Sequence, residues 1–274
     1  MARAGYARVG RQTLKQWRAA RRRVLAAGAT RGAVHELRMR TRRLVALEAL
    51  LAPTGSARRP GSVERELHEA FHASGRLRDA QLAARASRQL SPSLPAAARL
   101  ARHEDRRLPR LGASLQRELR AVRGRKLEAI VGSWLQPARG DAQQVLAQRA
   151  LRRLGAESRW LQGAGRGAAS TGAHRLHRRR IHVKRLRYMA ELVRAAGQQL
   201  PRGMHLPGLA LLQQGLGTIT DLDMELRLLA RFGAAHPRRR AAVRVLRGQL
   251  LLRRAAAVRQ LGIDTYSSRR AAGA

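Results

Sequence analysis

The sequence predicts an all-α protein that contains an internal duplication. Apolar residues recur at helical spacing through long segments, and no segment alternates convincingly with a period of two. Aromatic residues make up 3% of the chain, while Leu, Ala and Arg are abundant, which favours helix over sheet. A His/Arg pattern at residues 35–44 recurs at residues 177–186, 142 positions later. Repetition at a fixed offset indicates a duplicated unit.

Turn-rich clusters separate about eight helical segments. The segments are expected at roughly 8–27, 31–52, 62–90, 95–120 or beyond, 141–162, 173–196, 207–232 and 237–261. Clusters rich in Gly, Pro and Ser include Pro53 to Ser62, Pro137 to Asp141 and Gly163 to Gly172. The cluster at Pro137 divides the chain into a first four-helix repeat, 1–136, and a second, 137–261. Residues 262–274 show no periodicity and are predicted to form a flexible tail.

The charge balance predicts an anionic partner. The chain has 57 Lys and Arg against 17 Asp and Glu, and three of the basic residues are lysines. With a net charge of +40, the positively charged side chains repel one another when the chain folds. Guanidinium groups pair with phosphate oxygens in a bidentate fork. A GC-rich genome would also raise the arginine content without a functional reason.

Several classes of protein are disfavoured. The absence of cysteine excludes disulfides, thiolate metal sites and cysteine nucleophiles. The N-terminal stretch carries charges every few residues, unlike a secretory signal. The longest uncharged stretch, Leu206 to Thr220, is too short and too rich in Gly and Gln to span a bilayer. We therefore expect a cytoplasmic protein without a membrane partner.

The first basic segment, 31–52, has a cationic face and an apolar face. At about 100° per residue, His35, Arg38 and Arg42 fall together, with Arg43 at the edge. The opposite face carries four leucines, at positions 37, 44, 47 and 51. An ordinary solvated face mixes charges of both signs, whereas like charges four positions apart are destabilising. This face therefore predicts an anionic ligand.

The second basic segment, 173–196, repeats the arrangement. Its basic face carries His177, Arg180, Lys184 and Arg187, with Tyr188 among them. Leu186, Met189 and Val193 form the predicted core face. The two histidines would add a neutral donor or, below about pH 6.5, a further cation.

A second matched pair carries acids. The offset of 142 also relates Gly75 to Gly217 and Asp79 to Asp221. In so basic a chain, we expect these aspartates to orient guanidinium groups of neighbouring helices. Metal binding by Asp221 and Asp223 is a weaker alternative, because oxygen-ligand cages need several converging carboxylates.

One short motif is misleading. Residues His68 to His72 match the zinc-binding pattern H-E-x-x-H. The third ligand position of the longer pattern is Arg78, which does not bind zinc, and the second repeat has no counterpart. We expect no metal site, no cofactor and no catalytic residue.

These motifs together resemble the CHAD domain family (conserved histidine α-helical domain). The first hallmark stands here as H-E-L-R-M-R-T-R-R-L-V, from His35 to Val45. The second runs from His177 through Tyr188 to Glu191, and the family's L-G-x-x-x-D segment resembles residues 216–221. The resemblance covers almost the whole chain. The chain departs from the family's hallmarks at Met39, Val45 and Ile181. Because a basic residue is usual at position 45, Val45 is not among the expected contacts.

The resemblance implies two four-helix bundles related by a pseudo-twofold, with basic helix faces that bind inorganic polyphosphate at polyphosphate granules. Some relatives are fused to a CYTH-type triphosphatase, whose Glu-x-Glu-x-Lys signature is not found here. The expected polyphosphate-binding residues, with Asp79 and Asp221 as supporting acids, are His35, Arg38, Arg42, Arg43, His177, Arg180, Lys184, Arg185, Arg187 and Tyr188.

Four functions are compatible with the sequence, and non-catalytic polyphosphate binding is preferred. Non-specific nucleic-acid binding is the alternative that the charge permits, although few aromatics are present for base stacking. Phosphate hydrolysis would need a metal and clustered carboxylates. A role as accessory to a triphosphatase is a further alternative. The sequence sets no oligomeric state.

Overall fold

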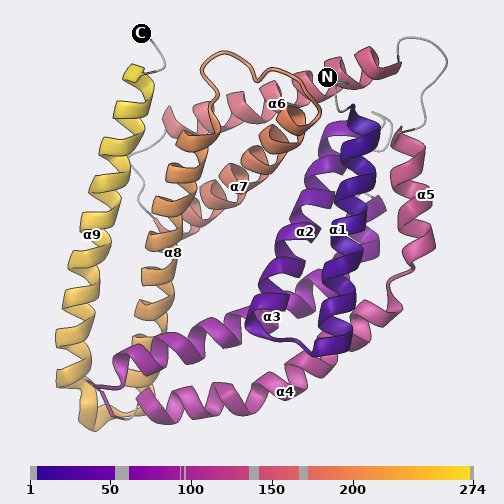
Figure 1. Ribbon diagram of the computed structural model, residues 1–274. Helices are drawn as coiled ribbons and strands as arrows, with labels where there is room; N and C mark the ends of the chain where they lie inside the picture. Colours follow the sequence, from indigo (N-terminus) through magenta and orange to yellow (C-terminus); the bar gives the residue numbers. More distant parts are fainter. Residues whose placement is uncertain are drawn as a thin grey trace. The chain divides into compact units, whose positions relative to one another are not determined.

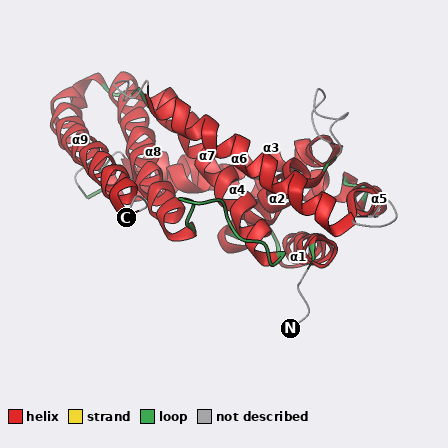
Figure 2. Ribbon diagram, turned by 90° about the horizontal axis from the view of Figure 1, so that it is seen from above, coloured by secondary structure: helices red, strands yellow, loops and turns green. Residues whose placement is uncertain are grey.

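The computed structural model describes residues 5–52, 62–92, 94–95, 97–135, 142–166 and 172–271. Within these residues all regular structure is helical, which confirms the predicted fold class (Figure 2). The helices are α1 (Tyr6–Ala27), α2 (Arg31–Leu51), α3 (Ser62–Leu90), α4 (Ala97–Ala121), α5 (Gly124–Leu135), α6 (Ala142–Arg166), α7 (Ala173–Ala195), α8 (Leu206–Ala235), the short 3-10 helix η2 (Pro237–Arg239) and α9 (Arg240–Ala271).

Two helical boundaries differ from the prediction. A separate helix, α5, precedes Pro137, so the described part of the first half has five helices rather than four. Helix α9 continues to Ala271 instead of ending at 261. The predicted linker, Pro137 to Asp141, and most of the other two clusters lie outside the described residues.

The chain forms two compact units, each drawn from both halves of the sequence. The first unit comprises residues 1–78, 110–160 and 185–206, and the second comprises 79–109, 161–184 and 207–274. Helices α3, α4, α6 and α7 each pass from one unit to the other. The units therefore do not coincide with residues 1–136 and 137–261, and the duplication stays a prediction.

Helices α1 and α2 run side by side in the first unit (Figure 1). The predicted apolar face of α2 is buried, with Leu37 2% exposed and the other three leucines fully enclosed. Trp17 Nε1 donates to Thr41 Oγ1 at 3.1 Å, and this hydroxyl donates to the carbonyl of Leu37 at 2.9 Å. The core is mainly leucine, alanine and valine, and Trp17 and Tyr6 are among its largest buried side chains.

Two glutamate side chains in the first unit accept hydrogen bonds from backbone N–H groups at the N-termini of helices. Glu48 of α2 is 7% exposed and accepts from the backbone N–H groups of Val63 at 3.0 Å and Glu64 at 3.2 Å, at the start of α3. Glu66 of α3 accepts from Arg123 N–H at 3.0 Å, where α5 begins. A carboxylate at this position accepts hydrogen bonds from backbone N–H groups that have no partner within the helix, and it is attracted by the positive end of the helix dipole. These acids fix where α3 and α5 start.

Replacement of Glu48 by alanine is expected to destabilise the protein. Two backbone N–H groups would lose a charged acceptor, which contributes about 2 kcal/mol. The measurement is the free energy of unfolding from urea titration. Glu69→Ala is the matched control, because Glu69 is exposed on α3. Equal stability of the two variants would contradict the capping role.

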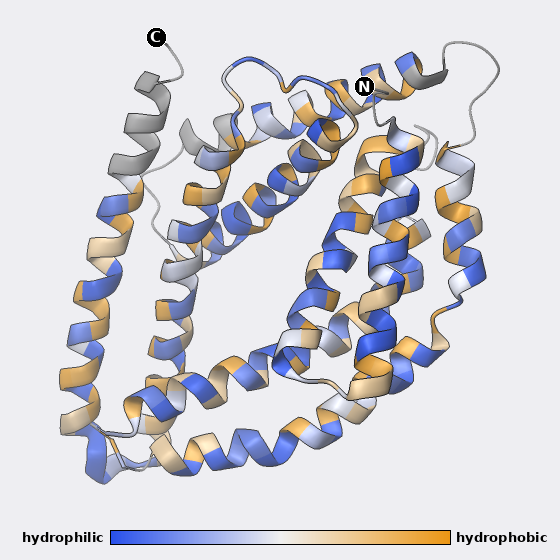
Figure 3. Cartoon of the chain, viewed as in Figure 1, coloured by the Kyte–Doolittle hydropathy of each residue, from blue (hydrophilic) through white to orange (hydrophobic). Residues whose placement is uncertain are grey.

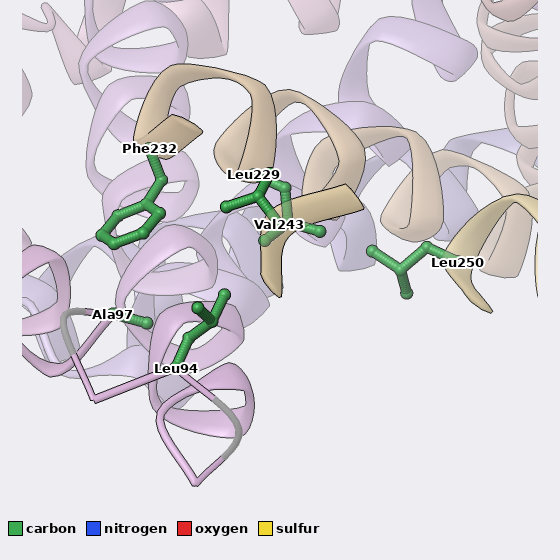
Figure 4. Close-up of a cluster of buried hydrophobic side chains, with 6 residues drawn as sticks. All are labelled: Leu94, Ala97, Leu229, Phe232, Val243 and Leu250. Carbon is green, nitrogen blue, oxygen red and sulfur yellow. The ribbon is translucent and has the colours of Figure 1, made fainter. Parts of the chain in front are cut away.

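Helices α8 and α9 form the core of the second unit. Leu229 and Phe232 of α8 meet Val243 and Leu250 of α9, and Leu94 of the α3–α4 connection and Ala97 of α4 close the cluster (Figure 4). A second cluster joins Leu176 and Val183 of α7 to Leu216, Ile219 and Leu261. Apolar and polar residues are interspersed along these helices (Figure 3). No helix within the described residues combines the length and apolar character that crossing a bilayer requires.

Candidate anion-binding site

Arg38 of α2 is anchored on α3 in the first unit. Its Nη1 donates to Ser74 Oγ at 2.9 Å and to the Phe71 carbonyl at 3.3 Å. The guanidinium carbon lies 4.9 Å from the centre of the Phe71 ring, within the range of a cation–π contact. A Cβ at Gly75 would stand 3.3 Å from Nη1, tighter than ordinary contact. The absence of a side chain at Gly75 therefore leaves room for the Arg38 guanidinium.

Arg42 shares the same aromatic support. Its guanidinium carbon lies 5.7 Å from the Phe71 ring centre, and its side chain is half-buried. His35, one turn before Arg38, is exposed. The two arginines of the predicted basic face of α2 are therefore supported by the Phe71 ring, and Arg38 also by a backbone and a hydroxyl oxygen.

Arginines of the two basic motifs meet at one carboxylate in the first unit. Glu191 Oε1 lies 2.8 Å from Arg187 Nη1, and Glu191 Oε2 lies 3.7 Å from Arg43 Nη1. All three side chains are half-buried. The arrangement holds two guanidinium groups against one carboxylate. It also shows that α2 and the C-terminal part of α7 lie together.

Tyr188 differs from the expectation. It is 5% exposed and lies in the core, with the Arg187 guanidinium carbon 5.0 Å from its ring centre. The ring supports the arginine and does not belong to an exposed basic face. Arg185 is exposed, and its Nε lies 3.7 Å from Glu157 Oε2 of α6.

The N-terminal part of α7, in the second unit, carries His177, Arg180 and Lys184. Burial lowers the pKa of His177, and the charges of Arg180 and Arg227 lower it further, with smaller effects from His174 and Lys184. The cations around the imidazole therefore oppose its protonation. Arg180 Nε is buried and has no hydrogen-bond partner among the described residues.

The predicted supporting acids, Asp79 and Asp221, are both exposed. Their role as partners of the motif arginines stays a prediction. Burial, followed by the nearby Asp221 carboxylate, raises the pKa of Glu225. Asp223, the second carboxylate of the metal alternative, lies 2.6 Å from Arg254 Nε of α9.

Four residues that contact the motif arginines were absent from the predicted site: Phe71, Ser74, Glu157 and Glu191. Glu191 stands four positions after Arg187, which is a local ion-pair spacing that the sequence displays. Ser74 precedes Gly75 directly, but its contact with Arg38 spans 36 positions and follows from the packing of two helices.

The H-E-x-x-H motif lies on an exposed part of α3. The rings of His68 and His72 contact each other, with centroids 4.3 Å apart. Glu69 Oε1 lies 4.0 Å from His68 Nε2. Within the described residues, no three side chains of the types that ligate metals come together.

Comparison with known proteins identifies the family. Residues 8–230 match the CHAD domain. The fold is similar to that in the crystal structure of the CHAD domain from the plant Ricinus communis, with a TM-score of 0.65 and 21% identity over 96% of this chain and 90% of that one. No curated protein matches the sequence. The residues matched include both basic motifs, and the chain belongs to the CHAD domain family.

Proposed function

We propose that this protein binds inorganic polyphosphate, without catalysis, through the basic faces of α2 and α7. The observation that carries the proposal is the meeting of Arg43 and Arg187 at Glu191, which brings arginines of both motifs to one place. The proposed contacts are His35, Arg38, Arg42, Arg43, His177, Arg180, Lys184, Arg185 and Arg187.

The supports of these side chains suit a repeating anion. Arg38 and Arg42 are held by Phe71 and Ser74, so their guanidinium groups lose little freedom when phosphoryl oxygens bind.

Titration and competition test the proposal. Long-chain polyphosphate should bind the full chain at moderate salt, with a steep loss of affinity as salt rises. Polyphosphate should displace DNA at matched charge, and orthophosphate should not be released with Mg²⁺ or Mn²⁺ present. Displacement of polyphosphate by DNA would favour a nucleic-acid-binding protein, and phosphate release would make the protein an enzyme.

The same proposal places the protein at polyphosphate granules in the cell. A fluorescent fusion should colocalise with granules and disperse when polyphosphate synthesis is blocked. A diffuse signal in cells that contain granules would contradict this assignment.

Polyphosphate binding is expected to take up protons near pH 6. The pKa of His177 lies below its ordinary value of about 6.5, mainly through burial and then through neighbouring cations, so the free imidazole is less protonated there than an ordinary histidine. A bound polyanion opposes those cations and raises the pKa. Proton uptake then makes the affinity rise as pH falls.

Calorimetry at pH 6 in two buffers of different ionisation enthalpy measures this uptake. His177→Gln should reduce the number of protons taken up. His103→Gln, at an exposed position on α4, should not. Unchanged uptake in the His177 variant would exclude this histidine from the site.

A further inference from the structure

Helix α9 has an apolar surface on the side opposite its core contacts. Its inner side is buried through Val243, Leu250 and Leu261. Its other side exposes large apolar residues, with Val245 64% and Leu252 73% exposed. Large apolar residues exposed together on one face, rather than scattered singly, mark interaction surfaces.

The exposed residues follow helical spacing. Ala241, Val245, Gly248, Leu252 and Ala256 are separated by four, three, four and four positions, and all five are exposed. No charged residue interrupts this set, which we call the outer stripe. Four turns of helix make it about 22 Å long. In a chain of net charge +40, an uncharged surface of this length is unexpected.

A row of arginines follows one edge of the outer stripe. Arg240, Arg244 and Arg247 are exposed and stand at helical spacing. None of them pairs with a carboxylate among the described side chains, whereas Arg254, on the inner side of α9, pairs with Asp223 at 2.6 Å. The row therefore presents uncompensated positive charge beside an apolar surface.

We propose that the outer stripe docks an amphipathic helix of a different protein, whose apolar side covers Val245 and Leu252 and whose carboxylates face the arginine row. A second copy of this chain is a poor occupant, because it would bring an identical arginine row. A lipid bilayer is also a poor occupant, because Ala and Gly offer little surface for insertion. The same small residues allow close approach of a second helix backbone.

This surface lies outside the residues that the family model matches, although the fold similarity to the Ricinus communis CHAD domain covers 96% of the chain. The match to the CHAD domain ends at residue 230, and α9 begins at Arg240. The outer stripe shares no residue with the basic motifs of α2 and α7. The inference therefore does not depend on polyphosphate binding.

A synthetic peptide tests the proposal on the full chain. The probe has 18 residues, with Leu and Ala along one side of a helix and Glu along the adjoining edge. A scrambled peptide of the same composition controls for charge attraction. At moderate salt, fluorescence anisotropy should show at least tenfold tighter binding of the amphipathic peptide than of the scrambled one.

Two variants locate the binding surface. Leu252→Gln should abolish the preference for the amphipathic peptide without changing the net charge. Leu211→Gln should retain it, because Leu211 is 59% exposed but lies on α8. Equal binding of both peptides, or an unchanged preference in Leu252→Gln, would overturn the proposal. Self-association in ultracentrifugation that disappears in Leu252→Gln would assign the surface to a second copy, and loss of binding to phosphatidylserine vesicles in that variant would assign it to a membrane. Both results contradict the proposal.

Discussion

Replacing Arg42 and Lys184 together by alanine should lower the affinity for long-chain polyphosphate about thirtyfold at moderate salt. Each side chain is expected to contribute about 1 kcal/mol through a screened contact with phosphoryl oxygens, and a total of about 2 kcal/mol corresponds to that factor. The salt dependence should weaken as well. With about 0.7 counterions released per contact on a single-stranded polyanion, the log–log slope should fall by about 1.4.

A matched control separates site contacts from general attraction. Lys15→Ala with Arg22→Ala removes the same two charges from exposed positions on α1, outside both motifs. This control should change the affinity less than threefold. If both double variants lost affinity equally, binding would depend on net charge, and the basic faces of α2 and α7 would have no special role.

Replacing Glu191 by glutamine should have two opposite effects. The free protein should lose about 1 to 2 kcal/mol of stability, because Arg43 and Arg187 would lose the carboxylate that they share. Polyphosphate affinity should rise roughly fivefold, since an internal anion would no longer compete for these guanidinium groups. The bound form should recover most of the lost stability.

Thermal unfolding with and without polyphosphate measures both effects in one experiment. Glu69→Gln provides the control, because Glu69 is exposed on α3 and contacts neither arginine. A Glu191 variant that was less stable and also bound polyphosphate more weakly would show that Glu191 positions the arginines rather than competing with the ligand.

The sequence predicts the helices well where their signals are local. Apolar spacing places the leucines of α2 on the buried side. The segment predicted at 62–90 has the bounds of α3. Helix α5 was not delimited, because no proline marks the break after Ala121. The acceptor at its start, Glu66, lies 57 positions earlier in the chain.

The site was predicted in part for the same reason. His35, Arg38 and Arg42 follow from spacing along one helix, but the residues that hold them come from another helix. Tyr188 falls on the basic side of α7 by its angle alone. Its burial depends on the packing of this end of α7 in the first unit, where Glu191 contacts Arg43 of α2. Periodicity along one segment does not contain that information.

Calorimetric titration of the full chain with polyphosphates of graded length tests most directly whether both motifs bind one polymer. If they do, short chains should bind weakly, affinity should rise sharply above a threshold length, and Arg42→Ala and Lys184→Ala should each abolish that rise. A smooth increase with every added phosphate, left intact in either variant, would contradict joint binding and indicate a diffuse basic surface.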